Sequence, residues 1–520
     1  MSQVLPPPLP QTTLPILKTE AEVISELLAL GCDEFVLCGG ARNAVLVSHL
    51  CMHPKLRTFH HFEERSAAFF ALGRTKATGL PCAVVTTSGT AVAECLPAVI
   101  EAHYSVLPLI IVSADRPEDF RGSGAPQAIE QDGIFTAYAH VGPDWKGHGP
   151  LHLNVPLGEA KLEDPIEHPE PEPFLPERRS FDVLKLRDFL SKGVFKGLVV
   201  MVGGLDEDDR EETFHFLKQL AVPVVADVTS GLREALGNLI TPEAVLRKNL
   251  PGKVLRLGEV PVSRLWRDLE DQPKIEVLSI CKNGLPGLAR ESDVIAAEVG
   301  RIFRGLGDPQ EIGDIRDDLP NARRELSRID ELLEAYPDSE PGLVRTLSIY
   351  ATTSDSLFLG NSLPIREWND FAQREVPYVN VRANRGANGI DGQLSTWLGA
   401  TTDEEDAWGI FGDLTTLYDL SSPALFSQIE TSGRVLVVIN NNGGAIFDRL
   451  PRLDGMSDQQ RAAIVQPHEA DLSKWAEMWG INHIKVTQEE DFDLLETTES
   501  PLLLELVPSK EQSDAFWEAL

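Results

Sequence analysis

The chain has 520 residues, and its 80 acidic against 47 basic side chains give a formal net charge of −33. This charge argues against sequence-independent binding to DNA or RNA and against an anchor on anionic lipid, because both need a basic surface. A hydrophobic content of 42% is enough for buried cores, and at ~100–200 residues per domain the length suggests about three domains. Anionic small substrates remain compatible with the charge, since a pocket can be locally basic.

The first residues, MSQVLPPPLPQTTLP, lack the basic and apolar segments of a secretory signal and are expected to form an extended leader. No apolar run approaches the ~20 residues that a membrane span needs. Six cysteines without CxxC spacing favour buried, reduced thiols in a cytoplasmic protein over disulfides or metal ligands. They are Cys32, Cys38, Cys51, Cys82, Cys95 and Cys281.

The first part of the chain alternates helical and strand patterns. Helices are predicted over residues 20–30 and 64–79, and strands in DEFVLCGG, PCAVVTTSGT and LPLIIVSADRP. This alternation indicates a doubly wound parallel sheet, whose ligand site lies at the carboxyl ends of the strands. The segments CGGARN, TTSGT and SADRP all fall at such ends.

Two further α/β runs follow. The Pro/Glu-rich residues 163–179 predict a linker, because this stretch suits neither a helix nor a central strand. Strands are then predicted in GLVVMVGGL, VPVVADV, GKVLRLGEV and KIEVLSI, an amphipathic helix over 318–336, and a last run in DSLFLGNSLP, AWGIFGDL and RVLVVINNNGG. The predicted fold class is therefore α/β, with three doubly wound parallel-sheet domains.

The stretch from Gly412 to Gly443 predicts a metal and phosphate site. One strand ends at Gly412 and Asp413, a helix is expected next, and the following strand ends in NNNGG with Asn441. In a parallel βαβ unit the chain returns to the same edge of the sheet, where carboxylate, amide and backbone oxygens can meet around one cation. Such ligands suit Mg²⁺, and glycines beside a helix N-terminus suit a diphosphate. The alternative is that these side chains make only turn and cap bonds.

The spacing GD…NNxG resembles the metal–diphosphate motif of thiamine diphosphate enzymes, with Leu414 where their third position is usually Gly. Further segments narrow the resemblance: HHFEERSAAFFALGRTKATG, AVVTTSGTAVAECLPAVIEA, SADRPEDFRGSGAPQAIEQ, LGNSLPIREW and NRGANGIDGQLST. Together they are similar to the menaquinone-pathway family of 2-succinyl-5-enolpyruvyl-6-hydroxy-3-cyclohexene-1-carboxylate synthases. The likeness runs from about residue 20 to 510 and is weakest over 165–330; GDL in place of GDG is typical of this branch.

The resemblance implies a pyrimidine-binding domain over residues 1–165, a central domain over 180–315 and a diphosphate- and metal-binding domain over 340–520. It implies thiamine diphosphate with Mg²⁺ or Mn²⁺ as cofactors. The implied reaction decarboxylates 2-oxoglutarate and adds the resulting succinyl carbanion equivalent to isochorismate. Sites of this superfamily lie across a subunit interface, so a homodimer or homotetramer is expected, without nucleic acid or a stable membrane anchor.

Glu64 is the expected catalytic residue. Taken by itself, it is an ordinary first-turn carboxylate at the start of a helix. The resemblance aligns it with the glutamate that shares a proton with N1′ of the cofactor's aminopyrimidine, whereas Glu63 is expected to be a bystander. The resemblance places cofactor contacts at Glu64, Ile390, Gly412, Asp413, Leu414, Asn441, Gly443 and Phe447, and metal ligands at Asp413, Asn441 and Gly443. For Ile390 and Phe447, plain core packing is an equal alternative.

Several arginines stand in the matching motifs, and guanidinium groups bind carboxylates in a bidentate manner. By resemblance they hold the carboxylates of the two substrates; the alternative is solvation or local ion pairing at the surface. The expected substrate residues are Arg42, Arg116, Gln127, Arg264, Ser362, Arg366 and Arg385. Ala41, Pro126 and Ser263 depart from the family pattern, which puts details of substrate recognition in question.

Two other function classes stay open on the sequence alone. One is another thiamine diphosphate-dependent 2-oxoacid decarboxylase or carboligase, which would share Glu64 and Asp413 but need not have the arginines. The other is a non-catalytic homologue that keeps the fold. The simultaneous presence of Glu64, Asp413 and Asn441 argues against the second class.

Overall fold

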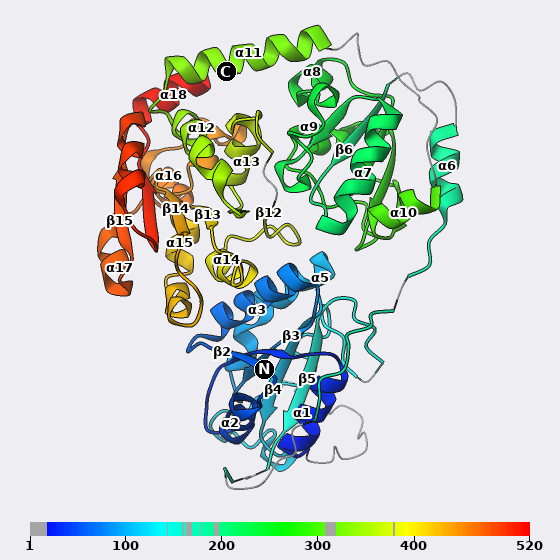
Figure 1. The fold of residues 1–520 in the computed structure, drawn as a ribbon, viewed down its shortest axis with the longest axis vertical. Coiled ribbons are helices and arrows are strands. Elements are labelled where there is room, and N and C mark those ends of the chain that lie inside the picture. Colours follow the sequence, from blue (N-terminus) through cyan, green and yellow to red (C-terminus); the bar gives the residue numbers. More distant parts are fainter. Residues whose placement is uncertain are drawn as a thin grey trace, which may run out of the picture.

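Three parallel α/β units make up the molecule, which is known from a computed structural model. The structure describes residues 18–142, 144–158, 161–162, 169–177, 179–191, 197–306, 319–377 and 380–520. In Figure 1 the N-terminal unit (blue) lies below, the central unit (green) at the upper right and the C-terminal unit (yellow to red) at the upper left. The predicted fold class is confirmed. The expected leader and residues 163–168 and 178 of the expected linker lie outside the described residues.

The N-terminal unit has a five-stranded parallel sheet in the order β2-β1-β3-β4-β5. Its inner strands are continuously buried, because helices cover both faces of the sheet. The strands are β1 (Glu34–Leu37), β2 (Arg57–His60), β3 (Cys82–Thr86), β4 (Leu109–Asp115) and β5 (Leu151–Pro156). The helices are α1 (Glu20–Ala29), α2 (Ala44–Met52), α3 (Glu64–Thr78), α4 (Ala91–Glu94) and α5 (Leu96–Ser105).

The central unit repeats this design with the strand order β10-β9-β8-β6-β7, again all parallel. Its strands are β6 (Leu198–Val202), β7 (Val224–Ala226), β8 (Lys253–Leu257), β9 (Glu276–Cys281) and β10 (Asp293–Ala296). Its helices are α6 (Val183–Ser191), α7 (Glu207–Leu220), α8 (Glu243–Lys248), α9 (Arg264–Asp268) and α10 (Val299–Leu306).

The C-terminal unit has a six-stranded parallel sheet in the order β12-β11-β13-β14-β16-β15. Its strands are β11 (Ser356–Leu359), β12 (Val381–Arg382), β13 (Ala407–Gly412), β14 (Arg434–Ile439), β15 (Asn482–Val486) and β16 (Leu502–Leu506). Its helices are α12 (Glu340–Tyr350), α13 (Leu363–Phe371), α14 (Gln393–Ala400), α15 (Asp413–Tyr418), α16 (Asp458–Val465), α17 (Leu472–Trp479) and α18 (Lys510–Ala519). The amphipathic helix expected over 318–336 is α11 (Leu319–Ala335), which runs across the top of Figure 1.

Most predicted strands and helices are present. The helix expected after Asp413 is the short α15, and a 3₁₀ segment, η6 (Ser422–Gln428), follows it with Pro423 in its first turn. All six cysteines are free, but Cys51 is exposed, so the expectation of burial was wrong for it. Among the described helices none is long and apolar enough to cross a membrane. The domain boundaries stay a prediction.

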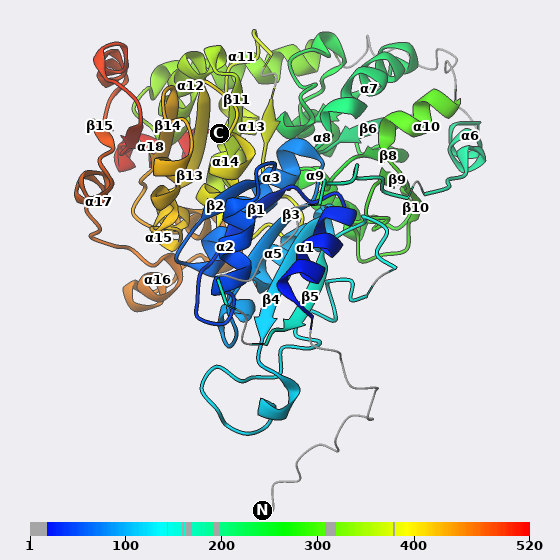
Figure 2. The same cartoon turned by 60° about the horizontal axis from the view of Figure 1, so that its bottom comes forward.

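Helices α3 and α14 join the N-terminal and C-terminal units by a close contact of their backbones. A Cβ atom at Gly73 of α3 would collide with the carbonyl oxygen of Thr396 and lie 2.6 Å from the amide nitrogen of Ala400. Beside this contact, Arg74 pairs with Glu34 at 2.7 Å and with Asp403 at 2.8 Å. Figures 1 and 2 both show α3 beside α14, and in Figure 2 the N-terminal unit comes forward, in front of the other two.

We predict that Gly73→Ala lowers the free energy of unfolding by about 1–3 kcal/mol, because the added methyl group forces the two helices apart. Urea denaturation followed by circular dichroism measures the change. The matched control is Gly305→Ala in α10, whose added Cβ would meet its nearest atom, on Val183, at an ordinary 3.4 Å. Equal stability of Gly73→Ala and the wild type would contradict the close contact.

Candidate active site

The carboxyl ends of four neighbouring strands, β12, β11, β13 and β14, bring the expected C-terminal site residues to one edge of the sheet. Gly412 at the end of β13 pairs with Ile439 at the end of β14, so the loops that follow leave the sheet at the same level. Asp413 opens α15 and is buried; the amide of Leu414 donates to its Oδ1 at 2.6 Å, and the amide of Gly443 to its Oδ2 at 2.7 Å. Burial raises the pKa of Asp413, although these hydrogen bonds oppose the shift.

Asn441 presents an unmatched oxygen at the same edge. Its Nδ2 donates to Oε1 of Glu340 at 2.7 Å, whereas its Oδ1 is buried and accepts no hydrogen bond. A buried acceptor without a partner is costly unless a ligand satisfies it. Among the described residues no group of three His, Cys, Asp or Glu side chains could hold a metal ion, so a cation here needs amide and backbone oxygens beside the carboxylate of Asp413. The donor set of Asp413 and Asn441 fits a hard cation.

Gly443 shapes the turn between these residues. Its φ of +118° is a conformation that residues with a side chain rarely adopt, and a Cβ there would lie 2.5 Å from the carbonyl oxygen of Val465. The turn places the Gly443 amide on Asp413. The structure therefore brings together all three residues expected to bind the metal, while their ligand roles stay a prediction.

His468 also lies at this site and was missed by the sequence reasoning. Its Nε2 is 3.2 Å from Oδ2 of Asp413, and its backbone amide donates to Oδ1 of Asn442 at 2.9 Å. A single histidine in the stretch QPHEAD carries no spacing signal, and only the folded chain brings it to Asp413.

Glu63 and Glu64 have different environments at the start of α3. Glu63 caps the helix, accepting from the amides of Arg65 and Ser66, and its Oε2 accepts from the hydroxyl of Ser421 in the C-terminal unit at 3.2 Å. The Glu64 side chain is half-buried and bonds no other described residue. Burial raises the pKa of Glu64, and the nearby charge of Glu63 adds to the shift. Of the two carboxyls, that of Glu64, the expected catalytic residue, is thus the one without a hydrogen bond to another described residue.

Arg366 and Arg385 lie close together at the ends of β11 and β12. Nη1 of Arg385 donates to Oδ1 of Asn361 at 2.8 Å, and its Nε is buried without a partner. Arg366 bonds the carbonyl oxygen of Ser362, which starts α13 with a φ of +74°. Burial lowers the pKa of Arg366, and the charges of Arg385 and Arg267 lower it further. Because Arg385 and Arg366 bond the consecutive residues Asn361 and Ser362, two half-buried guanidinium groups lie at one strand end, an arrangement that suits an anion.

The expected substrate residues of the N-terminal unit follow its strand ends. Arg42 follows β1 and donates to the carbonyl oxygen of Leu157 at 3.3 Å. Arg116 follows β4; its guanidinium lies 5.1 Å from the Phe120 ring centre, and its Nε is buried without a hydrogen bond. Gln127 is exposed, with a φ of +58°.

Arg264 stands apart from this set. Its side chain is 54% exposed and donates to Asp268 one turn along α9, at 3.0 Å. Ser263, at one of the departures from the family pattern, caps the same helix and donates to Glu243 at 2.6 Å. The neighbouring Arg267 is the one whose charge reaches Arg366. The structure therefore does not bring Arg264 together with the arginine pair.

Two apolar positions complete the expected cofactor set. Ile390 is half-buried in the loop between β12 and α14. Phe447, in the 3₁₀ segment η7 (Ala445–Arg449), is 36% exposed and packs beside Gly444. This exposure leaves the Phe447 ring accessible and disfavours the alternative that it only packs in the core.

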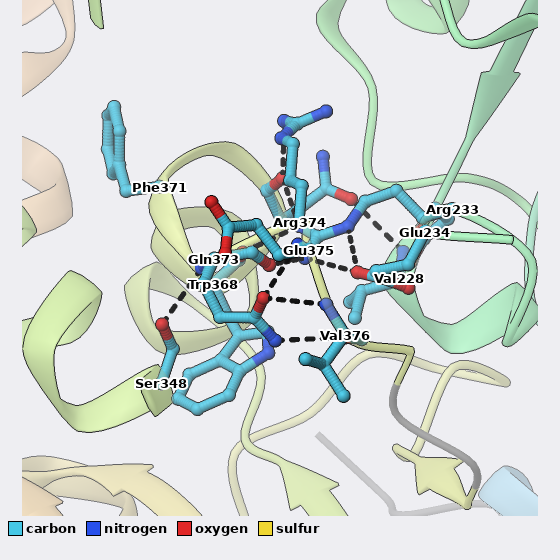
Figure 3. Close-up of polar contacts among 12 residues, drawn as sticks. Val228, Arg233, Glu234, Ser348, Trp368, Phe371, Gln373, Arg374, Glu375 and Val376 are labelled. Carbon is cyan, nitrogen blue, oxygen red and sulfur yellow. Dashed lines mark hydrogen bonds and ion pairs between the residues drawn. The ribbon is translucent and has the colours of Figure 1, made fainter. Parts of the chain in front are cut away.

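A contact from the central unit positions α13, the helix that carries Arg366. The buried Arg233 donates to the carbonyl oxygens of Trp368 at 2.9 Å and Gln373 at 3.1 Å, which lie at the C-terminal end of the helix. Figure 3 shows Arg233 and Glu234 on the central-unit side of this junction and Trp368, Gln373 and Arg374 on the other. The location of Arg366 therefore depends on the docking of the central unit.

Comparison with known proteins is consistent with this geometry. Residues 18–134 match the family described as thiamine pyrophosphate enzyme, N-terminal TPP binding domain. The 2-succinyl-5-enolpyruvyl-6-hydroxy-3-cyclohexene-1-carboxylate synthase of Akkermansia muciniphila is 44% identical, with 96% of this chain and 98% of that protein aligned. The enzyme of the same name from Bdellovibrio bacteriovorus is 39% identical over 96% and 97% of the two chains, and that from Chloroflexus aurantiacus 31% over 90% and 89%.

We predict that Gly443→Ala weakens binding of thiamine diphosphate about 10- to 100-fold, because strain at this φ costs on the order of 1–3 kcal/mol and disturbs the turn at Asp413. Fluorescence titration with thiamine diphosphate in a buffer containing Mg²⁺ measures the affinity. Gly455→Ala is the matched control, since Gly455 shares a positive φ of +80° but its added Cβ would meet nothing within 4 Å. Unchanged affinity of Gly443→Ala would show that the turn is not part of the cofactor site.

Proposed function

The chain belongs to the family of 2-succinyl-5-enolpyruvyl-6-hydroxy-3-cyclohexene-1-carboxylate synthases, and from this membership we propose how its residues bind the cofactors and substrates. It is a thiamine diphosphate-dependent transferase of menaquinone biosynthesis. The proposed substrates are 2-oxoglutarate, which is decarboxylated, and isochorismate, which accepts the succinyl group. We place the reaction in the cytoplasm, a location that the six free cysteines support.

The C-terminal strand ends hold the cofactor's diphosphate and a divalent metal ion, Mg²⁺ or Mn²⁺, in this proposal. Asp413, Asn441 and the backbone at Gly443 bind the metal, which satisfies the buried Oδ1 of Asn441. The N-terminus of α15 and the backbone at Gly412 and Leu414 lie beside the diphosphate. When bound, thiamine diphosphate supplies the carbanion chemistry by which a 2-oxoacid loses CO₂.

Glu64 supplies the acid that tunes the cofactor. Its carboxyl shares a proton with N1′ of the aminopyrimidine, and a raised pKa suits this task because the proton is retained to higher pH. Ile390 and Phe447 support the bound cofactor with apolar surface. Because the Glu63 carboxylate caps α3, the carboxyl of Glu64 is the one available to the cofactor.

One observation carries the substrate assignment: Arg385 bonds the side chain of Asn361 and Arg366 bonds the carbonyl oxygen of the next residue, Ser362, so two half-buried guanidinium groups lie at the same strand end. The carboxylates of the substrates offset the repulsion between these two positive charges. Ser362 lies at the same strand end, and Arg42, Arg116 and Gln127 extend the polar lining from the N-terminal unit. Arg264 takes part only if its side chain leaves Asp268.

The protein acts as a homodimer, or a tetramer built from such dimers, in this proposal. Within one chain no hydrogen bond or ion pair among the described residues joins the Glu64 and Asp413 side chains. Phe62, two positions before Glu64, is 71% exposed, and Tyr418 and Leu420, in the segment that His61 and Arg65 bond, are 51% and 39% exposed. A group of exposed large apolar side chains beside a site favours cover by a second copy. The site then forms between Glu64 of one subunit and Asp413 of the other.

We predict that Glu64→Gln lowers turnover about 100- to 10,000-fold, because the amide cannot exchange the proton with the cofactor. The assay supplies isochorismate, 2-oxoglutarate, thiamine diphosphate and Mg²⁺ and follows the product by mass spectrometry. The control is Glu94→Gln, which removes an exposed carboxylate whose charge also acts on Glu64 and should keep most of the turnover.

The same assay distinguishes the proposed function from the two other function classes. Release of CO₂ from 2-oxoglutarate without addition to isochorismate would indicate a different decarboxylase or carboligase of this cofactor class. Absence of CO₂ release from the wild type would indicate a non-catalytic homologue. Turnover of Glu64→Gln near that of the wild type would remove Glu64 from its proposed role.

We predict that a heterodimer of one Glu64→Gln and one Asp413→Asn subunit regains about half of the wild-type activity, because one of its two shared sites is intact. Both homodimers should be inactive. The two chains are co-expressed with different tags, and the heterodimer is purified and assayed. An inactive heterodimer would place each site within one chain, and failure to recover any mixed species would contradict the dimer.

A further inference from the structure

The orientation of the Asn441 amide matters for the proposed metal site. An asparagine side chain carries an oxygen on one side and an NH₂ group on the other, and its neighbours determine which faces a given direction. Here Nδ2 points to Oε1 of Glu340 at 2.7 Å, and Oδ1 is buried without a partner. An ionised carboxylate only accepts hydrogen bonds, so this contact selects one of the two orientations.

Glu340 is itself held on several sides. It is 3% exposed at the start of α12, and its amide donates to the hydroxyl of Ser513 at 2.9 Å. Arg449 donates from Nη2 to Oε2 of Glu340 and from Nη1 to Oε1 of Glu367, each at 2.9 Å. The guanidinium of Arg449 also lies 4.1 Å from the Trp517 ring centre. Oε2 of Glu340 thus accepts from Arg449 and Oε1 from Asn441. The carboxyl of Glu367 also lies against Glu340, whose charge adds to burial in raising the pKa of Glu367.

The neighbouring asparagine shows what is particular about Asn441. Asn440 also donates its Nδ2 to a buried carboxylate, Oε1 of Glu505, at 2.7 Å. However, Oδ1 of Asn440 accepts from the amide of Asn442 at 3.3 Å, so this side chain is satisfied at both ends. Of these two carboxylate–asparagine pairs, that of Glu340 leaves a buried amide oxygen without a hydrogen bond, whereas that of Glu505 does not.

We propose that Glu340 is a positioning residue of the metal site, which acts by holding the Asn441 amide with its oxygen toward the cation. This inference rests on the proposed function, since it assumes that a divalent metal binds with thiamine diphosphate. Outer groups that orient a ligand contribute about 10- to 100-fold to metal affinity. Glu340 touches neither metal nor substrate in this arrangement.

The isosteric variant Glu340→Gln tests the orientation. A glutamine offers an NH₂ group as well as an oxygen, so Asn441 can meet it in either orientation and can turn its own NH₂ toward the cation. Loss of the Glu340 charge leaves Arg449 paired with Glu367, so no buried cation is left unpaired. Glu505→Gln is the matched control, because it makes the same chemical change at the neighbouring Asn440.

The experiment titrates metal-free protein with Mn²⁺ in the presence of thiamine diphosphate and without a 2-oxoacid. Electron paramagnetic resonance measures the free Mn²⁺. We expect about 10- to 100-fold weaker Mn²⁺ binding for Glu340→Gln, an unchanged affinity for Glu505→Gln and an intermediate one for Glu340→Asp. At saturating Mn²⁺ the kcat of Glu340→Gln should approach the wild-type value, while the metal concentration for half-maximal rate rises.

The outcomes separate the two proposals. Wild-type protein that binds no Mn²⁺ with thiamine diphosphate would overturn the proposed metal site. Wild-type protein that binds Mn²⁺ while Glu340→Gln binds it equally well would overturn the role of Glu340 alone. If Glu340→Gln does not fold, as judged by circular dichroism, Glu340→Asp decides: wild-type affinity overturns the inference, and weaker affinity supports it.

Discussion

The backbone contact between α3 and α14 is the constraint on which the site depends. A Cβ atom at Gly399 would collide with the carbonyl oxygen of Phe70, and one at Gly392 with the ring of Phe69, so the two helices meet without intervening side chains. Glu64 begins α3, and the loop with Arg385 and Ile390 leads into α14. Close-packed interiors transmit small shifts, so this contact determines where Glu64 lies relative to Arg385 and Ile390 of the same chain.

Buried acids satisfy the polar groups around this contact. Asp419 accepts from the amide of Ser395 at 2.8 Å and from the hydroxyl of Ser66 at 3.0 Å, which ties α3 to α14. Glu101 of α5 accepts from the amides of Gly386 and Ala387, both at 2.7 Å, and so holds the loop next to Arg385. These carboxylates replace water at backbone amides that would otherwise be unpaired, which makes the loop geometry definite.

The protein is acidic overall, but its candidate site is locally basic. The net charge is −33, yet Arg366 lies near Arg385 and Arg267, whose charges lower its pKa. Elsewhere acidic side chains form ion pairs with nearby basic ones, as Asp268 does with Arg264 at the surface. Repulsion among the clustered guanidinium groups is tolerated because the surrounding fold holds them in place, and in the proposed function this positive charge favours anionic substrates.

The sequence by itself determined the three parallel units and most of the candidate site. Buried apolar runs ending in Gly, Asp, Asn or Arg place those residues at strand ends, and parallel sheets bring strand ends to one edge. Only the tertiary structure decided which members meet: it left Arg264 paired with Asp268 at the surface, added His468 and Glu340, and made Glu63 a helix cap. The reason is physical, since periodicity along the chain determines local structure, whereas contacts between residues far apart in the sequence, such as Asp413 with His468 and Asn441 with Glu340, arise only from tertiary packing.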